Sequence, residues 1–134
     1  MTNHELFHLS NITSIKEFRD EYTEIVQKKP NRKKIEVKVL ALLNLLNSTK
    51  YISELCKTDN FEKLTDTSAS LYAMKIKMGS SCNIRIIFLY ERNGSILLLL
   101  FEEKAGKRKT DYSRAIPIAV ERLKAAKGGK PWQK

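Results

Sequence analysis

The fold is decided by the stretch LYAMKIKMGSSCNIRIIFLYERNGSILLLLFEE, which spans residues 71–103. Three runs within it, at 71–78, 82–90 and 95–103, are rich in apolar, β-branched and aromatic residues, and the first alternates with the period of a strand. A Gly-Ser-Ser turn separates the first two runs, and an Asn-Gly pair, the strongest short hairpin signal, lies before the third. The stretch therefore predicts an antiparallel meander of three strands.

Two helices are predicted before this meander. Ser14 and Glu17 match a capping box, and the apolar residues after them follow helical spacing as far as Val26. Residues 32–47 carry a second apolar stripe, whose members are Ile35, Val39, Leu42, Leu43 and Leu46. Alternating apolar residues at the start of that segment also allow a strand, but its length favours a helix.

The other segments carry weaker signals. Residues 5–10 could form a short N-terminal strand, and residues 48–57 a helical turn or two. Residues 58–70 are polar and are expected to form a loop. A last helix is expected over about residues 113–127, with Pro117 in its first turn.

Helices on both sides of a meander in the sequence indicate an α+β fold. We expect an antiparallel twisted sheet, made of the three-strand meander plus a short N-terminal strand, with helices packed on one face. The 134 residues are expected to form one domain. Its parts are the N-terminal strand and helices in 1–70, the meander, basic loop and last helix in 71–127, and a loose tail in 128–134.

The chain is basic, and its charge is unevenly distributed. Lys and Arg number 25 and Asp and Glu 15, so the net charge is +10. Residues 1–70 hold 11 basic and 10 acidic side chains, whereas residues 71–134 hold 14 and 5. Such an excess suggests a polyanionic partner, most often nucleic acid or an anionic membrane. The alternative is a basic surface that binds nothing specific.

Several protein classes are disfavoured by the composition. No apolar run approaches the roughly 18 residues that span a bilayer, and the N-terminus does not match a secretory signal. Cys56 and Cys82 are too few for a disulfide scaffold and suit a reducing compartment. We therefore expect a cytoplasmic protein with no membrane partner.

Clustered cations are the strongest sign of a binding site. Alternation along 71–78 puts Lys75 and Lys77 on one side of a strand, roughly 7 Å apart, on the face that the helices are expected to leave open. Arg85 on the neighbouring strand joins them if the register allows. Three such cations repel one another unless a phosphate lies between them.

The order and spacing of four motifs resemble the RelE family of bacterial toxins from type II toxin–antitoxin systems, which has the HigB toxins as close relatives. The motifs are Lys75-Ile76-Lys77, Arg85 with its apolar neighbours, Gly106-Lys107-Arg108, and Tyr112-Ser113. The resemblance covers about residues 71–124.

The resemblance implies an mRNA interferase, that is, a ribosome-dependent endoribonuclease and hydrolase that inhibits translation. In such enzymes the 2′-hydroxyl of the RNA attacks the adjacent phosphate and leaves a 2′,3′-cyclic phosphate, with no metal or cofactor. The implied partners are mRNA on the ribosome and a cognate antitoxin protein, with which the toxin can form a hetero-oligomer.

The resemblance also implies a role for each candidate residue. Lys75 and Lys77 would line the site, with Lys77 as general base or as the cation nearest the attacking oxygen. Arg85 would clamp the phosphate, Arg108 would lie near the leaving oxygen, and Tyr112 would orient the nucleophile or stack on a base. RNA backbone contacts are implied for Lys104, Lys107 and Lys109.

Three other interpretations compete with this one. A catalytically inactive RelE-like module would bind RNA or the ribosome through the same basic face, and charge alone cannot separate it from the enzyme. A DNA-binding protein is disfavoured because no helix combines a basic recognition face with a helix-turn-helix partner. His4 to His8 match the zinc motif H-E-x-x-H, but no further histidine exists as a third ligand, so we expect them to flank an N-terminal strand.

Overall fold

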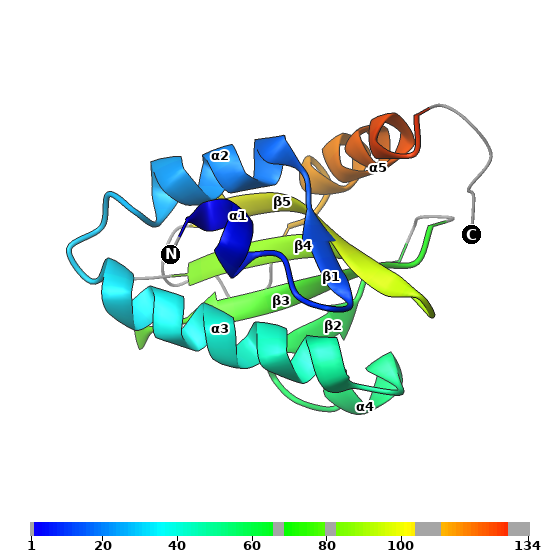
Figure 1. The fold of residues 1–134 in the computed structure, drawn as a ribbon, viewed down its shortest axis with the longest axis horizontal. Coiled ribbons are helices and arrows are strands. Elements are labelled where there is room, and N and C mark those ends of the chain that lie inside the picture. The colour runs from blue at the N-terminus through cyan, green and yellow to red at the C-terminus, as the bar shows by residue number, and fades with distance from the viewer. Residues whose placement is uncertain (1, 66–68, 80–82, 104–110, 129–134) are drawn as a thin grey trace.

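A computed structural model describes residues 2–65, 69–79, 83–103 and 111–128. In chain order its elements are α1 (Asn3–Leu6), β1 (Ile12–Ser14), α2 (Lys16–Ile25), α3 (Arg32–Ser48), α4 (Ile52–Leu55), β2 (Phe61–Lys63), β3 (Leu71–Lys77), β4 (Asn83–Glu91), β5 (Gly94–Glu102) and α5 (Ala115–Ala126). They form an α+β fold around a five-stranded sheet with the order β1-β5-β4-β3-β2 (Figure 1). Because β1 runs parallel to β5 while the other pairs are antiparallel, the sheet is mixed.

The three strands predicted between residues 71 and 103 are present as β3, β4 and β5, which pair antiparallel in succession. They form the centre of a larger sheet, with β1 and β2 at its edges. The predicted hairpin turn contains Gly94, whose φ is +147°, and a Cβ at this position would lie 3.2 Å from the backbone oxygen of Asn11. Glycine fits this turn because the position has both a positive φ and a close backbone neighbour.

The N-terminal segment folds differently from its prediction. The prediction of a strand over residues 5–10 flanked by the histidines is wrong, because α1 runs to Leu6 and the rest of the segment makes only an isolated bridge between Leu9 and Ile12. Thr2 and Glu5 form a reciprocal capping box, in which each side chain accepts a hydrogen bond from the other residue's backbone N–H. The first strand follows later, as β1, and its parallel pairing with β5 was not foreseen.

The edge strand β2 lies within the segment predicted to be a loop. Phe61 is only 1% exposed and pairs in register with Met74 of β3. A strand of three residues is too short to show the alternation of apolar and polar residues by which a strand is predicted from sequence. The strand is nevertheless important, because it places Glu62 beside β3.

Helices α2 and α3 confirm the two helices predicted before the meander, and all five residues of the predicted α3 stripe are buried. The predicted cap of the first helix is wrong. Ser14 ends β1, and α2 begins at Lys16 without a side-chain hydrogen bond at its cap. The Ser14 hydroxyl accepts a hydrogen bond from Nη1 of Arg19 instead, at 2.9 Å.

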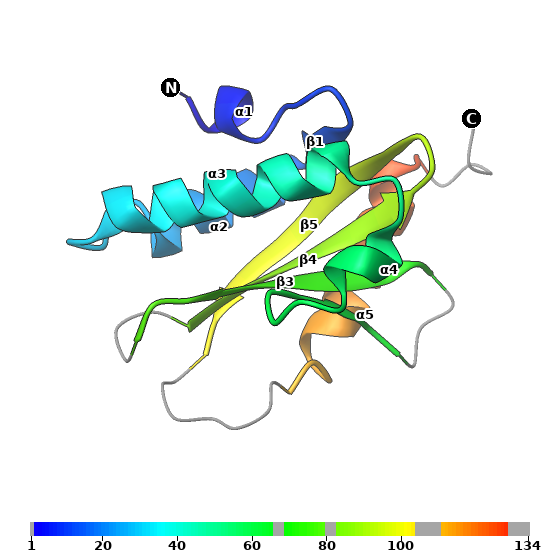
Figure 2. The ribbon, with the colours of Figure 1, turned by 90° about the horizontal axis from the view of Figure 1, so that it is seen from below.

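Helices pack on both faces of the sheet, so the prediction that they cover one face is wrong (Figure 2). On one face α1, α2 and α3 enclose the larger core, which includes Met74 and Ile76. On the other face, here called the α5 face, α5 buries Ala115, Ala119 and Leu123 in a smaller core. The reason is that the alternate residues of β3, β4 and β5 are apolar on this side as well, for part of their length.

Candidate functional site

The α5 face changes character along its strands. Its apolar part, with Ala73 and Ile87, packs against α5. Further along the same strands, Lys75 lies directly opposite Arg85, and Lys77 lies opposite Asn83. Because side chains two residues apart in a strand point the same way, Lys75, Lys77 and Arg85 share this face, which the sequence predicted for the two lysines and left open for Arg85. The register that decides the position of Arg85 is thereby settled.

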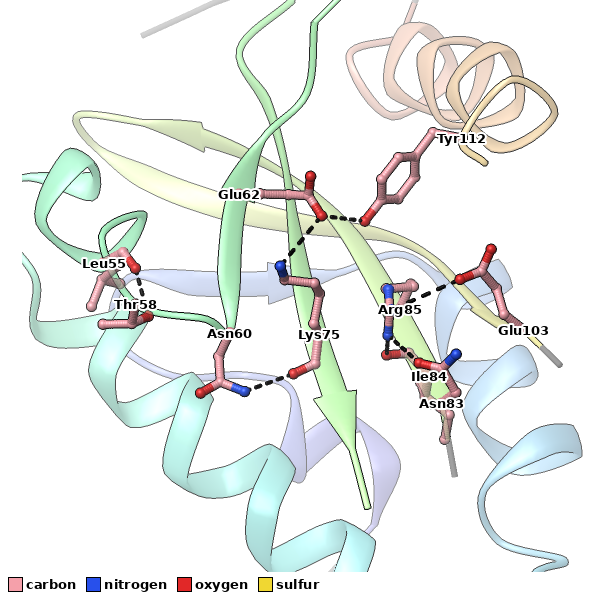
Figure 3. A network of polar contacts seen from close by, with 10 residues as sticks. All are labelled: Leu55, Thr58, Asn60, Glu62, Lys75, Asn83, Ile84, Arg85, Glu103 and Tyr112. Atoms are coloured by element: carbon pink, nitrogen blue, oxygen red, sulfur yellow. Dashed lines mark hydrogen bonds and ion pairs between the residues drawn. The ribbon is translucent and has the colours of Figure 1, made fainter. Parts of the chain in front are cut away.

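Lys75 is paired with a carboxylate from the edge strand. Its Nζ lies 3.7 Å from Oε1 of Glu62, and the same oxygen accepts a hydrogen bond of 2.9 Å from the Tyr112 hydroxyl (Figure 3). The side chains of Lys75 and Glu62 are 19% and 39% exposed. Glu62 is therefore a half-open carboxylate held between an ammonium group and a phenol.

The backbone of Lys75 is fixed by the turn that precedes β2. Its N–H donates to the backbone oxygen of Asn60 at 2.8 Å, and its own carbonyl accepts from Nδ2 of Asn60 at 3.0 Å. Thr58 holds the same turn by donating to the carbonyl of Leu55 at 2.6 Å (Figure 3). These contacts extend the pairing of the edge beyond β2 and hold Lys75 in place.

Arg85 is buried, with 4% of its surface exposed. Its Nη1 donates to Oδ1 of Asn83 at 2.6 Å and to the carbonyl of Ile84 at 3.2 Å, and its Nη2 lies 3.8 Å from Oε1 of Glu103. The Glu103 side chain is itself only 5% exposed. The expectation of three cations on an open surface is thus wrong for Arg85, because a buried carboxylate compensates its charge there.

Glu103 is held by backbone contacts on both sides. Its N–H donates to the carbonyl of Asn83 at 2.9 Å, and its Oε2 accepts from the N–H of Asp111 at 3.3 Å. Its other oxygen, Oε1, is buried and accepts no hydrogen bond from the described residues. The pair between Arg85 and Glu103 is therefore a charge contact at 3.8 Å without a direct hydrogen bond.

The predicted site residues have different outcomes. The fold brings together Lys75, Arg85 and Tyr112, and we call these three with Glu62 and Glu103 the cation–carboxylate cluster. Lys77 is on the same face but exposed, and within the described ranges it has no ion pair. The remaining predicted residues, Lys104, Lys107, Arg108 and Lys109, lie outside the described residues.

Neither carboxylate was predicted from the sequence to have a site role. Glu62 lies in a segment taken for a loop, and only the edge pairing of β2 brings it near Lys75. Glu103 lies two residues after Phe101, the register partner of Arg85, so strand alternation at the end of the third run was a usable signal.

The cluster combines three chemical capacities. An ammonium and a guanidinium group stabilise negative charge on a phosphate. A carboxylate such as Glu62 accepts a proton when it is within hydrogen-bond reach of the donor. A phenol positions a neighbouring group or stacks on a base. All three capacities converge within a few side chains at one end of the α5 face.

The other motif considered, H-E-x-x-H, forms part of α1 and the residues after it. The rings of His4 and His8 stack with centroids 5.4 Å apart. Across the described ranges, no group of three or more His, Cys, Asp or Glu side chains is arranged to hold a metal ion.

The chain matches no protein-family model, no curated protein and no solved structure. Among the helices described, none is both long and apolar enough to cross a membrane. Function is therefore inferred from the cation–carboxylate cluster and from the charge of the surface.

Proposed function

We propose that this protein is a metal-independent endoribonuclease of the RelE type, a toxin that cuts mRNA on the ribosome and is silenced by an antitoxin. One observation carries the proposal: β3 and β4 place Lys75 directly opposite Arg85, with Glu62 and Tyr112 in contact beside them. This arrangement combines cations for a phosphate with a proton acceptor, which are the groups that RNA cleavage by its own 2′-hydroxyl requires.

The reaction is an in-line displacement at phosphorus. The 2′-oxygen forms a bond to the phosphorus and loses its proton, and the bond from phosphorus to the 5′-oxygen breaks. The products are a 2′,3′-cyclic phosphate and a 5′-hydroxyl, whose oxygen takes its proton from solvent water. Charge builds up on the phosphoryl oxygens between these two events, where Lys75 and Arg85 would stabilise it.

Two side chains are candidates for the group that takes the proton. The family resemblance favours Lys77, which must lose its own proton before it can act as a base. The geometry favours Glu62, whose Oε1 already accepts a hydrogen bond from a hydroxyl, that of Tyr112, at 2.9 Å. We assign the general base to Glu62 and a phosphate-binding role to the exposed Lys77.

Arg85 reaches a phosphate only if Glu103 releases it, because both side chains are 5% exposed. The two side chains form a loose pair. Their charged atoms are 3.8 Å apart, and Oε1 of Glu103 accepts no hydrogen bond from the described residues. We propose that the scissile phosphate replaces the Glu103 carboxylate as the partner of Arg85. The charge of the guanidinium group then stays compensated throughout.

The antitoxin part of the proposal is supported by a groove of about 850 Å³ next to the cluster. Its lining combines apolar residues of α2, β5 and α5, including Ile25, Phe101 and Ile118, with charged ones, which are Glu21, Glu102, Glu103, Asp111 and Arg114. Ile118 is a large apolar side chain that remains 45% exposed. A segment of a partner protein that filled this groove would lie against the carboxylate that holds Arg85.

A catalytically inactive module that binds RNA or the ribosome is the second candidate. The observation that favours it is the burial of Arg85 against Glu103. If that pair never opens, the cluster stabilises the fold and only the exposed cations contact RNA.

A reconstituted translation reaction separates the two candidates. Wild-type protein is added to ribosomes stalled on a defined mRNA, and cleavage is mapped by primer extension. The 3′ ends are tested for a cyclic phosphate. We expect cleavage by the wild type, and a loss of about 100-fold or more in Glu62→Gln, since general-base catalysis contributes that much.

Glu54→Gln is the matched control, because Glu54 is an exposed carboxylate that pairs with Lys57 at the surface. Lys77→Ala tests the rival base at an exposed position where folding is not at risk. A wild-type protein that binds ribosomes without cleaving mRNA would favour the inactive module. Cleavage lost in Lys77→Ala but kept in Glu62→Gln would move the role of base to Lys77.

A further inference from the structure

A second concentration of positive charge lies far from the meander in sequence. Residues 28–38 contain six basic side chains and one acidic one, Glu36, whereas the rest of residues 1–70 holds 5 basic and 9 acidic side chains. Four of the six are in the first two turns of α3, namely Arg32, Lys33, Lys34 and Lys38, and we call them the α3 patch.

The four cations of the α3 patch are available to a partner. Arg32, Lys33 and Lys34 are exposed, Lys38 is partly exposed, and none of the four forms an ion pair with a described residue. The two basic residues before the helix differ from them. Lys28 pairs with Glu24 at 2.9 Å, and Lys29 pairs with Glu102 at 2.8 Å.

The α3 patch lies at the end of the helix where positive charge is destabilising. The amino end of a helix carries a partial positive charge and favours acidic residues, yet the first turn of α3 has none. Asn31 makes no side-chain hydrogen bond to cap it. Lys34 and Lys38 are four residues apart, a spacing at which like charges repel. Residues that break local rules in this way are expected at functional surfaces.

The α3 patch lies at the same end of the sheet as the cation–carboxylate cluster. The start of α3 lies toward the end of the sheet where β3 ends and β4 begins, but on the face opposite the cluster (Figures 1 and 2). The ion pair of Lys29 with Glu102 joins the turn before α3 to the end of β5, one residue before Glu103. A long polyanion that passes around this end of the sheet can contact both surfaces.

We propose that the α3 patch binds the phosphate backbone of double-helical RNA, as a docking surface separate from the cleavage site. The inference rests on the proposed function, which supplies the RNA. Such contacts position a protein on RNA without reading its sequence. A membrane surface fits less well, since Val37 is the only large apolar side chain exposed in these turns of α3 and membrane-binding helices need an apolar face. The same lack of apolar surface disfavours an acidic peptide helix.

The test compares two variants of equal charge. In the patch variant, Arg32, Lys33, Lys34 and Lys38 are all changed to Gln. In the control variant Arg92, Lys16, Lys50 and Lys124, which are exposed elsewhere, are changed to Gln. The probe is a fluorescein-labelled RNA duplex of about 16 base pairs. Its dissociation constant is measured by fluorescence anisotropy between about 50 and 200 mM KCl.

We expect the patch variant to bind the duplex at least about tenfold more weakly and to lower the salt slope by about 2 or more, because each lost phosphate contact removes about 0.9. The control variant should keep most of its affinity. The patch variant should also unfold at no lower urea concentration than the wild type, because its cations oppose the helix dipole. Weak binding by a folded variant thus reports on the surface alone.

Equal losses in both variants would overturn the inference, since they would reflect net charge only. So would patch-dependent binding to phosphatidylglycerol vesicles or to poly-glutamate with none to the RNA duplex. The proposed function fails by a different result, namely no mRNA cleavage by the wild type. Patch-dependent duplex binding without cleavage would leave the docking surface standing and the nuclease refuted.

Discussion

Nη2 of Arg85 lies 3.8 Å from Oε1 of Glu103, and each of these side chains is only 5% exposed. Removing one partner of a buried ion pair takes an attractive contact away from a desolvated charge, which typically destabilises a fold by about 3–5 kcal/mol. We therefore expect Glu103→Gln to lower the free energy of unfolding by about 3 kcal/mol in urea titrations.

Glu102→Gln is the control for this change. Glu102 is the neighbouring residue and also has a cationic partner, Lys29, but its side chain is 32% exposed. Its loss should change the free energy of unfolding by less than about 1 kcal/mol. Similar effects of the two substitutions would contradict the burial of the pair formed by Arg85.

The hydrogen bond between Tyr112 and Glu62 joins residues that are 50 positions apart in sequence. Because the carboxylate of Glu62 is the acceptor, the effects of Tyr112→Phe and Glu62→Ala on the free energy of unfolding should not be additive. We expect a coupling energy of about 1 kcal/mol in a double-mutant cycle measured by urea denaturation. Tyr51→Phe combined with Glu62→Ala provides the comparison, because Tyr51 is 69% exposed and should show no coupling.

The centre of the fold was accessible from sequence because its signals are local. The Asn-Gly turn and the β-branched runs identify β3, β4 and β5, and the apolar stripe of α3 identifies a buried helix. The strands at the two edges of the sheet could not be predicted from the sequence. Strands β1 and β2 have three residues each, and their places depend on pairing with distant segments.

The candidate site shows the same division. Alternation alone puts Lys75 and Lys77 on one face, and a register that the sequence leaves open puts Arg85 opposite Lys75. The burial of Arg85 could not be inferred, because it depends on Glu103 reaching back from the next strand. A sequence shows which charges lie on one strand face, but the compensation of each charge depends on tertiary contacts.

Arg122 of α5 and Glu21 of α2 form a two-pronged ion pair across the edge of β5, with contacts of 2.8 and 2.9 Å. Arg122 also donates to the carbonyl of Leu98 at 2.9 Å, and Glu21 accepts from the N–H of Leu100 at 3.0 Å. The pair thus joins the helices of the two faces and satisfies backbone groups of the strand beyond its pairing with β1.

Arg122→Ala should therefore lower the free energy of unfolding by about 2 kcal/mol, since the pair is only partly buried. Hydrogen exchange of the Leu100 amide should become faster at the same time. Lys124→Ala, an exposed change in the same helix, should stay within about 0.5 kcal/mol of the wild type. Unchanged exchange at Leu100 would show that the ion pair does not protect this edge.

Tyr22 is fully buried beneath α1, and its ring meets that of Phe7 edge to face with centroids 4.7 Å apart. Its hydroxyl has no hydrogen-bond partner among the described residues. Burial, with a smaller contribution from the charge of Glu36, raises the pKa of Tyr22 well above its ordinary value. The folded protein therefore favours the neutral phenol.

The raised pKa of Tyr22 determines how the free energy of unfolding changes at high pH. In the unfolded chain the phenol of Tyr22 ionises near pH 10, whereas in the fold it stays neutral, so this contribution to stability is complete below about pH 10 and declines above it. The Tyr22→Phe protein should lack this loss of stability above pH 10. At pH 7 its free energy of unfolding should be no more than about 1 kcal/mol below that of the wild type, because the hydroxyl makes no hydrogen bond to a described residue that the substitution would remove. Urea titrations at pH 7 and about 10.5 measure both effects, with Tyr51→Phe as the exposed control. A Tyr22→Phe protein that loses as much stability as the wild type between these pH values would show that the buried phenol is not responsible.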